Sequence, residues 1–235
     1  PLRFVTAKKG YQFSFKYPDP EDGEIAEGDD NYYYILRYMN SFEEALYGDN
    51  FKDPATGYRK YIDVESFAKW YIVAELTANH DPNMYYVMPN RGAKLKKGPL
   101  WDSEWSLGTS YRGGPTDAWA VPPRKPDPHQ VIWGNWKYFG RLFQDPYFKE
   151  VVKKEWEEFK PRIPMVKEKL EDVAASINEA QAMNFARWPV IGTYLGASLI
   201  CLGSWEEEVQ YNSDFLSTNF NNNLSYLIFV PCFLK

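Results

Sequence analysis

Apolar and polar residues alternate near the start of the chain. Tyr11, Phe13 and Phe15 are separated by polar residues and are followed by a proline-rich turn at residues 18–20. Alternation with a period of two is typical of a half-buried strand, and a proline-rich stretch ends it. We therefore expect a strand here, at the edge of a sheet.

The pattern then changes to helical spacing. Ser41 and Glu44 match a capping box, but Gly48 follows so soon that only a brief helix is expected. Asp63 is a suitable N-cap for a longer helix. The apolar stripe of that helix consists of Val64, Phe67, Ala68, Tyr71 and Ile72. Glu75 continues the stripe, so its carboxylate points either into the protein or to water at the rim.

A β-hairpin is expected after this helix. Pro82 disfavours helical geometry in the residue before it, so the helix ends near Asn79. Residues 84–88 and 94–100 read as strands, and the Pro-Asn-Arg-Gly sequence at 89–92 reads as the turn between them.

The second half is predicted to be mostly helical. Residues 109–128 lack periodicity and form a long loop, and loops of this length are usually functional lids or disordered segments. Asp145-Pro146 is a helix start, and Ser204 with Glu207 forms a capping box. The helical stretches are expected at residues 138–143, 147–160 and 163–186 and after Ser204.

Composition excludes several functions. The chain has 235 residues, of which 44% are hydrophobic, enough for a real core. Its 27 basic and 32 acidic residues give no basic surface for nucleic acid or an anionic membrane. With cysteines only at Cys201 and Cys232, and histidines only at His80 and His129, neither a disulfide scaffold nor a zinc site of the usual kind is expected. No signal peptide or membrane-spanning run is present, and a start at Pro1 predicts a piece of a longer chain.

The hairpin brings two carboxylates together. Asp81 precedes its first strand and Asp102 follows its second, so antiparallel strands place them at the same end. Converging carboxylates repel unless a cation separates them, and Mg²⁺ commonly sits between carboxylates and substrate phosphates. The pattern thus favours metal-assisted phosphoryl transfer. The alternative is that Asp81 caps the Pro82 turn and Asp102 is an ordinary loop carboxylate.

Several strings resemble the CotH (spore coat protein H) kinase family. They are FSFKYPDPED, YMNSFEEALYGDNF, TGYRKYIDVESF, ELTANHD, GAKLKKGPLWDSEWSLG and NFARWP, spread from the start of the chain to about residue 210. The resemblance implies an α+β, atypical protein-kinase-like fold. It implies a mainly helical C-terminal lobe with a β-hairpin carrying the metal site, and an incomplete N-terminal sheet lobe. The implied boundaries are 1–30 for the end of the sheet lobe and the lobe junction, 31–217 for the helical lobe, and 218–235 for an atypical tail.

The resemblance also implies roles for individual residues. Asp81 matches the catalytic-loop aspartate, which orients or deprotonates the acceptor hydroxyl, and Asp102 matches the metal-binding aspartate. Glu104 stands where the family has a second metal-facing acidic or amide residue, next to Ser103 in place of an aromatic residue. The cofactor-binding candidates are Asn79 and Asn83, as amides that face or support the metal, and Trp101, which would help wall the nucleotide pocket. ATP and Mg²⁺ are the implied cofactors, and a protein with a Ser or Thr acceptor is the implied partner.

Three functions remain open at this point. The first is a CotH-like kinase, and the second is an inactive relative that serves as a surface or spore-coat scaffold. The third is a carbohydrate-binding module that stacks sugars on the aromatic residues Trp105, Tyr111, Trp119, Trp133 and Trp136. The resemblance places the protein outside the cell or on the bacterial surface. The sequence does not decide catalytic activity or oligomeric state.

Overall fold

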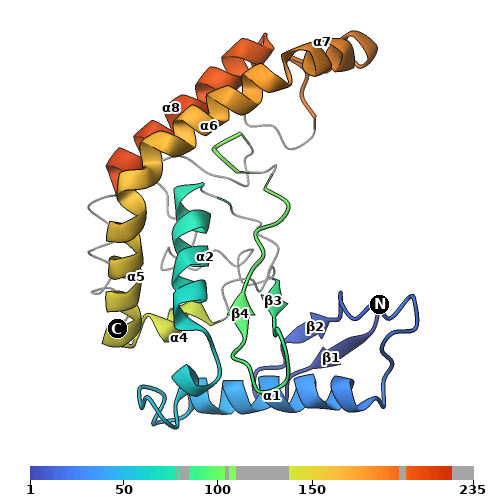
Figure 1. Ribbon diagram of the computed structural model, residues 1–235, viewed down its shortest axis with the longest axis vertical. Coiled ribbons are helices and arrows are strands. Elements are labelled where there is room, and N and C mark those ends of the chain that lie inside the picture. The colour runs from blue at the N-terminus through green and yellow to red at the C-terminus, as the bar shows by residue number, and fades with distance from the viewer. Residues whose placement is uncertain (78, 80–84, 104–105, 110–137, 196–199, 224–235) are drawn as a thin grey trace. The chain divides into compact units, whose positions relative to one another are not determined.

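The computed structural model describes residues 1–235 except 78, 80–84, 104–105, 110–137, 196–199 and 224–235, and only the backbone of 219–223. The described chain is helical with two two-stranded sheets, which confirms the α+β class (Figure 1). It divides into two compact units, Pro1–Val64 with Val87–Lys96 and Glu65–Tyr86 with Lys97–Lys235. The lobe boundaries at residues 30 and 217 stay a prediction.

The first unit begins with an antiparallel pair of short strands. β1 (Arg3–Val5) pairs with β2 (Gln12–Ser14), with Phe4 opposite Phe13. The rings of this pair stack at 5.3 Å between centroids, and Phe4 is buried. The alternating pattern around Phe13 therefore does form a strand, as expected.

Helix α1 (Asp30–Tyr47) is longer than the sequence analysis predicted. The capping-box residue Ser41 lies in the interior of this 18-residue helix, so the brief helix expected from residue 41 was wrong. The physical reason is an apolar stripe that begins two turns earlier. Its buried members are Tyr32, Met39, Phe42 and Leu46.

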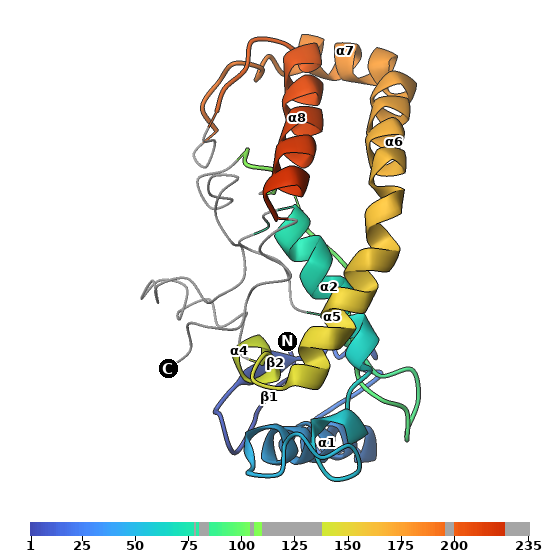
Figure 2. The same cartoon turned by 90° about the vertical axis from the view of Figure 1, so that its left-hand side faces the viewer.

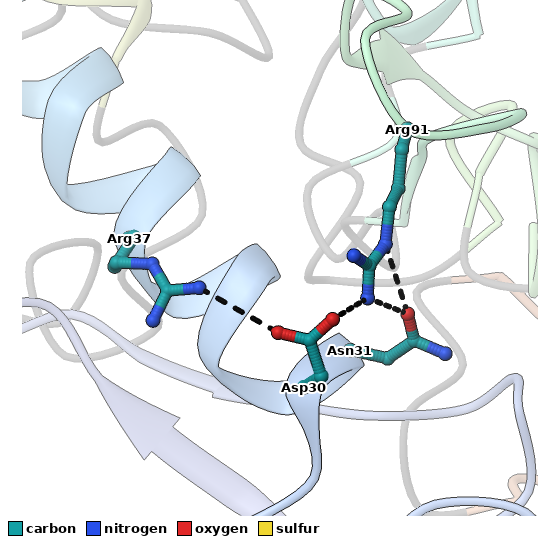
Figure 3. A network of polar contacts seen from close by, with 4 residues as sticks. All are labelled: Asp30, Asn31, Arg37 and Arg91. Atoms are coloured by element: carbon teal, nitrogen blue, oxygen red, sulfur yellow. Dashed lines mark hydrogen bonds and ion pairs between the residues drawn. The ribbon is translucent and has the colours of Figure 1, made fainter.

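Charged residues tie the hairpin turn to α1 within the first unit. Arg91 donates to the Asn31 side-chain oxygen across 2.6 Å and lies 2.7 Å from the Asp30 carboxylate (Figure 3). Arg37 approaches the other Asp30 oxygen at 4.0 Å. These groups are largely exposed, so their ion pairs add little to the free energy of unfolding. The network orients the hairpin turn against the start of α1.

The hairpin itself has short strands. β3 (Tyr86–Val87) pairs with β4 (Lys96–Lys97), which confirms the predicted hairpin with fewer paired residues. Just before β4, Leu95 forms a bridge with Ile62, beyond the short 3₁₀ helix η1 (Tyr58–Lys60). Both Ile62 and Leu95 are buried, so this bridge belongs to the core of the first unit.

Helix α2 (Val64–Leu76) confirms the helix predicted after Asp63. Its stripe is fully buried, and Glu75 is only 1% exposed, so the carboxylate lies in the core and not at the rim. The second unit continues with α4 (Phe139–Leu142), α5 (Pro146–Phe159) and the 3₁₀ turn η2 (Lys160–Arg162). Asp145 caps α5, accepting from the Tyr147 backbone N–H at 3.0 Å, as the Asp-Pro pair predicted.

Among the described residues, the last three helices are α6 (Ile163–Ser176), α7 (Asn178–Arg187) and α8 (Trp205–Asn223). Figures 1 and 2 show α6 beside α8. The predicted continuous helix over 163–186 is interrupted at Ile177, where Ser176 donates its hydroxyl hydrogen to the Val173 carbonyl. Such local side-chain bonds compete with helix continuation. No helix among the described residues is long and apolar enough to cross a membrane.

The capping box before α8 is confirmed. Ser204 Oγ accepts a hydrogen bond from the Glu207 backbone N–H at 3.2 Å. The Glu207 carboxylate reaches back one residue further than usual and accepts from the Gly203 N–H at 2.7 Å. The start of α8 is thus fixed by its own sequence.

Candidate functional site

The predicted site residues divide into two groups. Asn79, Trp101 and Asp102 are described by the structure. Asp81, Asn83 and Glu104 lie outside the described residues, as do the aromatic residues of the carbohydrate hypothesis. The meeting of Asp81 and Asp102 therefore stays a prediction, and the described part of the candidate site is the segment around Asp102.

Asp102 has an unusual backbone conformation. Its φ is 58°, and Leu107, five residues later, has a φ of 55°. Non-glycine residues rarely enter this left-handed region, although Asp tolerates it better than most. Conformations of this kind persist where surrounding structure enforces them, and they cluster at functional sites.

The C-terminal end of α2 holds this segment on one side. The Leu107 backbone N–H donates to the Thr77 carbonyl at 2.7 Å. The Asn79 side-chain amide reaches Ser103 Oγ at 3.5 Å, and Asn79 is buried. The structure thus brings Asn79 to the residue after Asp102, which fits a supporting role beside the predicted metal ligand.

Helix α8 covers the C-terminal end of the segment, at the residue after Leu107. Gly108 has a φ of 71°, and a Cβ at this position would lie 2.4 Å from the Phe215 ring and 2.9 Å from the Tyr211 hydroxyl oxygen. The Tyr211 hydroxyl donates to the Gly108 carbonyl at 3.2 Å. Only glycine combines this backbone angle with so close a neighbour. Sequence reasoning missed this contact.

Trp101 lies next to the left-handed aspartate with much of its ring in solvent. Trp101 is 59% exposed as a residue, and its ring meets the Tyr85 ring edge-on with 6.1 Å between centroids. An exposed aromatic face beside a carboxylate can wall a nucleotide pocket. The exposed ring of Trp101 could therefore contact a nucleotide, as predicted for this residue.

Sequence reasoning also missed Lys97. It is 6% exposed, and burial lowers the pKa of its amine to about 6. The signal was present in the sequence, because successive strand residues face opposite sides and Lys97 therefore shares a face with buried Leu95. Neighbouring Lys96 has a side chain that is 53% exposed.

The oxygen-rich side chains near Asp102 are suited to a hard cation. Carboxylate and amide oxygens are the ligands that Mg²⁺ prefers, and it commonly needs only one or two carboxylates from the protein. Asp102 supplies one exposed carboxylate, and the sequence places Glu104 two residues later. Among the described residues, no three acidic, His or Cys side chains gather as a metal cluster.

Comparison with protein families gives a match over most of the chain. Residues 5–227 match the family described as CotH kinase protein, which is nearly the whole chain and includes the hairpin, the Asp102 segment and α8. No curated protein matches the chain.

Proposed function

This chain belongs to the CotH kinase family, and we propose that it transfers the terminal phosphoryl group of ATP to Ser or Thr hydroxyls of a protein, with Mg²⁺ bound at Asp102. Membership in a kinase family implies the use of a nucleotide and a metal ion. The fold we propose is protein-kinase-like, with a mainly helical C-terminal lobe and an incomplete N-terminal sheet lobe. We further propose that the protein works outside the bacterial cell or on its surface.

The single observation that carries the proposal is the conformation of Asp102. Its left-handed backbone begins a segment whose C-terminal end is held by a hydrogen bond from Leu107 to the end of α2 and by a close contact of Gly108 with α8. An ordinary loop carboxylate needs no such enforcement, so this arrangement favours the metal-ligand role over the turn alternative.

We assign the other roles in phosphoryl transfer to named residues of this chain. Asp102 would hold Mg²⁺ together with Glu104, and the bound ion supplies charge neutralisation at the phosphate oxygens. Asp81 orients the acceptor hydroxyl and accepts its proton. Asn79 supports the Asp102 segment through Ser103. Trp101, with Asn83, contributes to the nucleotide side.

The test is Mg²⁺-dependent ATP binding by calorimetry, followed by transfer of labelled γ-phosphate to protein hydroxyls. Asp102→Asn should reduce transfer by roughly two orders of magnitude or more, because charge stabilisation is the main catalytic device in phosphoryl transfer. Asp172→Asn, an exposed aspartate on α6, is the matched control.

Two results would contradict the proposal. ATP binding that does not depend on Mg²⁺ would contradict the role of Asp102 as a metal ligand. Equal rates of phosphoryl transfer by the Asp102→Asn and Asp172→Asn variants would contradict it as well. Absence of both binding and transfer in the native protein would favour the inactive scaffold.

A further inference from the structure

Lys97 occupies an aromatic cage in the second unit. Its Nζ lies 4.0 Å from the centroid of the Trp70 ring and 4.6 Å from that of the Tyr86 ring. The same nitrogen donates to the Tyr85 carbonyl at 3.1 Å. The amine is therefore held by two ring faces and one carbonyl oxygen.

This is a costly place for an amine. Within the described part of the chain, no carboxylate forms an ion pair with Lys97, and desolvation lowers the pKa of the amine. The two ring faces oppose that shift, because aromatic faces attract a cation. An apolar side chain of similar length would fill the same space without the desolvation cost. Packing alone therefore does not account for a lysine here.

The contacts of Lys97 lead to the Asp102 segment. The Tyr85 carbonyl that accepts from Lys97 Nζ also accepts from the Gly98 backbone N–H, at 3.0 Å. The Tyr85 ring meets the Trp101 ring, and Asp102 is the next residue. Lys97 thus fixes the carbonyl that anchors the start of the segment between β4 and Asp102.

The Lys97 backbone adds a second attachment. Its N–H donates to the Ser66 hydroxyl on α2 at 3.0 Å. Because Trp70 lies one helical turn further along α2, both the backbone and the side chain of Lys97 bind the same helix. The strand end that leads to Asp102 is therefore fixed to a buried helix at two points.

We propose that Lys97 is a positioning residue for phosphoryl transfer: its caged amine holds the Tyr85 carbonyl and thereby sets the path of the Gly98-to-Asp102 segment. This inference rests on the proposed function, since it assigns Lys97 a role through Asp102. Lys97 does not touch the reacting groups in this scheme.

Lys97→Met tests the idea, because methionine fills the cage but neither donates a hydrogen bond nor carries a charge. Lys96→Met, at the adjacent exposed lysine, is the matched control. We expect Lys97→Met to remain folded, with kcat reduced roughly tenfold and KM for ATP little changed, since small misplacements of a catalytic group cost rate more than binding. Lys97→Arg, which keeps N–H donors, should retain more activity than Lys97→Met.

A second readout does not depend on activity. Amide hydrogen exchange at Gly98, whose N–H is bonded to Tyr85, should accelerate roughly tenfold in Lys97→Met and stay unchanged in Lys96→Met. Unchanged kcat and unchanged Gly98 exchange in a folded Lys97→Met protein would overturn the proposal and leave the proposed function standing. A fall in kcat with no change at Gly98 would also overturn it.

The same pair of readouts separates this inference from the proposed function. If the native protein shows no Mg²⁺-dependent transfer, the proposed function fails, and Gly98 exchange alone decides whether Lys97 holds the segment. If Lys97→Met does not fold, Trp70→Phe replaces it, because it keeps the lysine and a buried ring but weakens the cage. Faster Gly98 exchange with lower kcat in Trp70→Phe supports the proposal, and native values of both overturn it.

Discussion

The backbone N–H of Leu107 donates a 2.7 Å hydrogen bond to the carbonyl oxygen of Thr77, the residue after α2. This carbonyl is one of those that a helix end leaves without an intrahelical partner. The bond satisfies it and at the same time fixes a residue whose φ is 55°. The end of α2 therefore constrains the segment that begins at Asp102.

Substitutions at Asp102 should show how much its left-handed backbone conformation affects the stability of the protein. Asn tolerates the left-handed region and Ala does not, so Asp102→Ala should lower the free energy of unfolding by about 1 kcal/mol more than Asp102→Asn. Urea denaturation of both variants measures the difference. At Asp172, inside helix α6, the order should reverse because Ala is the better helix former. Equal stability of Asp102→Ala and Asp102→Asn would contradict the enforced left-handed conformation.

Gly108→Ala should destabilise the protein by about 2–4 kcal/mol, the sum of left-handed strain and overpacking. The added Cβ would lie 2.4 Å from the Phe215 ring. Gly23→Ala is the control, since Gly23 has a φ of 75° but no atom within 4 Å of an added Cβ. It should cost about 1 kcal/mol from strain alone. Phe215→Leu combined with Gly108→Ala should recover part of the loss, and equal costs for the two glycines would argue against the contact with α8.

Lys97 should make stability depend on pH. Its pKa is about 6 in the folded protein against 10.5 for an ordinary lysine, so between these values the unfolded chain binds a proton that the folded protein does not. The free energy of unfolding should therefore rise with pH across this window, by no more than about 1.4 kcal/mol per pH unit. Below pH 6 both states are protonated and the dependence ends.

The measurement is urea denaturation of the native protein, Lys97→Met and Lys96→Met at several pH values between the folded pKa of about 6 and the ordinary value of 10.5. Lys97→Met should be more stable than the native protein at the lowest pH, and its advantage should shrink as pH rises. A difference that stays constant with pH would show that the amine titrates normally.

Helix α5 offers a test of local capping. Asp145 accepts from the Tyr147 N–H, so Asp145→Ala should lower the free energy of unfolding by about 1 kcal/mol. Asp29 also precedes a helix but makes no capping bond to it, so Asp29→Ala should cost less. Thermal and urea denaturation of both variants measure this. A cost at Asp29 equal to that at Asp145 would mean that the cap is not the cause.

Features encoded within a few residues were predictable from the sequence. The N-cap at Asp145, the capping box at Ser204 and the helix after Asp63 depend on neighbouring residues, and the structure confirms each. The start of α1 was misjudged because a capping box at Ser41 was given more weight than the apolar stripe that begins at Tyr32. Tertiary burial overrode the local signal.

The candidate site was predictable only in part. Asp102 was identified from flanking strings, but its left-handed conformation and the contact of Phe215 with Gly108, at the end of its segment, are not encoded in those strings. Lys97 was overlooked because a lysine in a strand usually faces solvent. Asp81, Asn83 and Glu104 lie outside the described residues, so their roles remain predictions.

The hydrogen bond from Tyr211 to Gly108 spans 103 positions of the sequence. A ribosome adding roughly 5–20 residues per second needs on the order of 5–20 seconds to cover that distance. During this interval the Asp102 stretch has already been synthesised, while the helix that covers its far end has not. The Asp102 segment is therefore covered by α8 only after the other described helices have been translated.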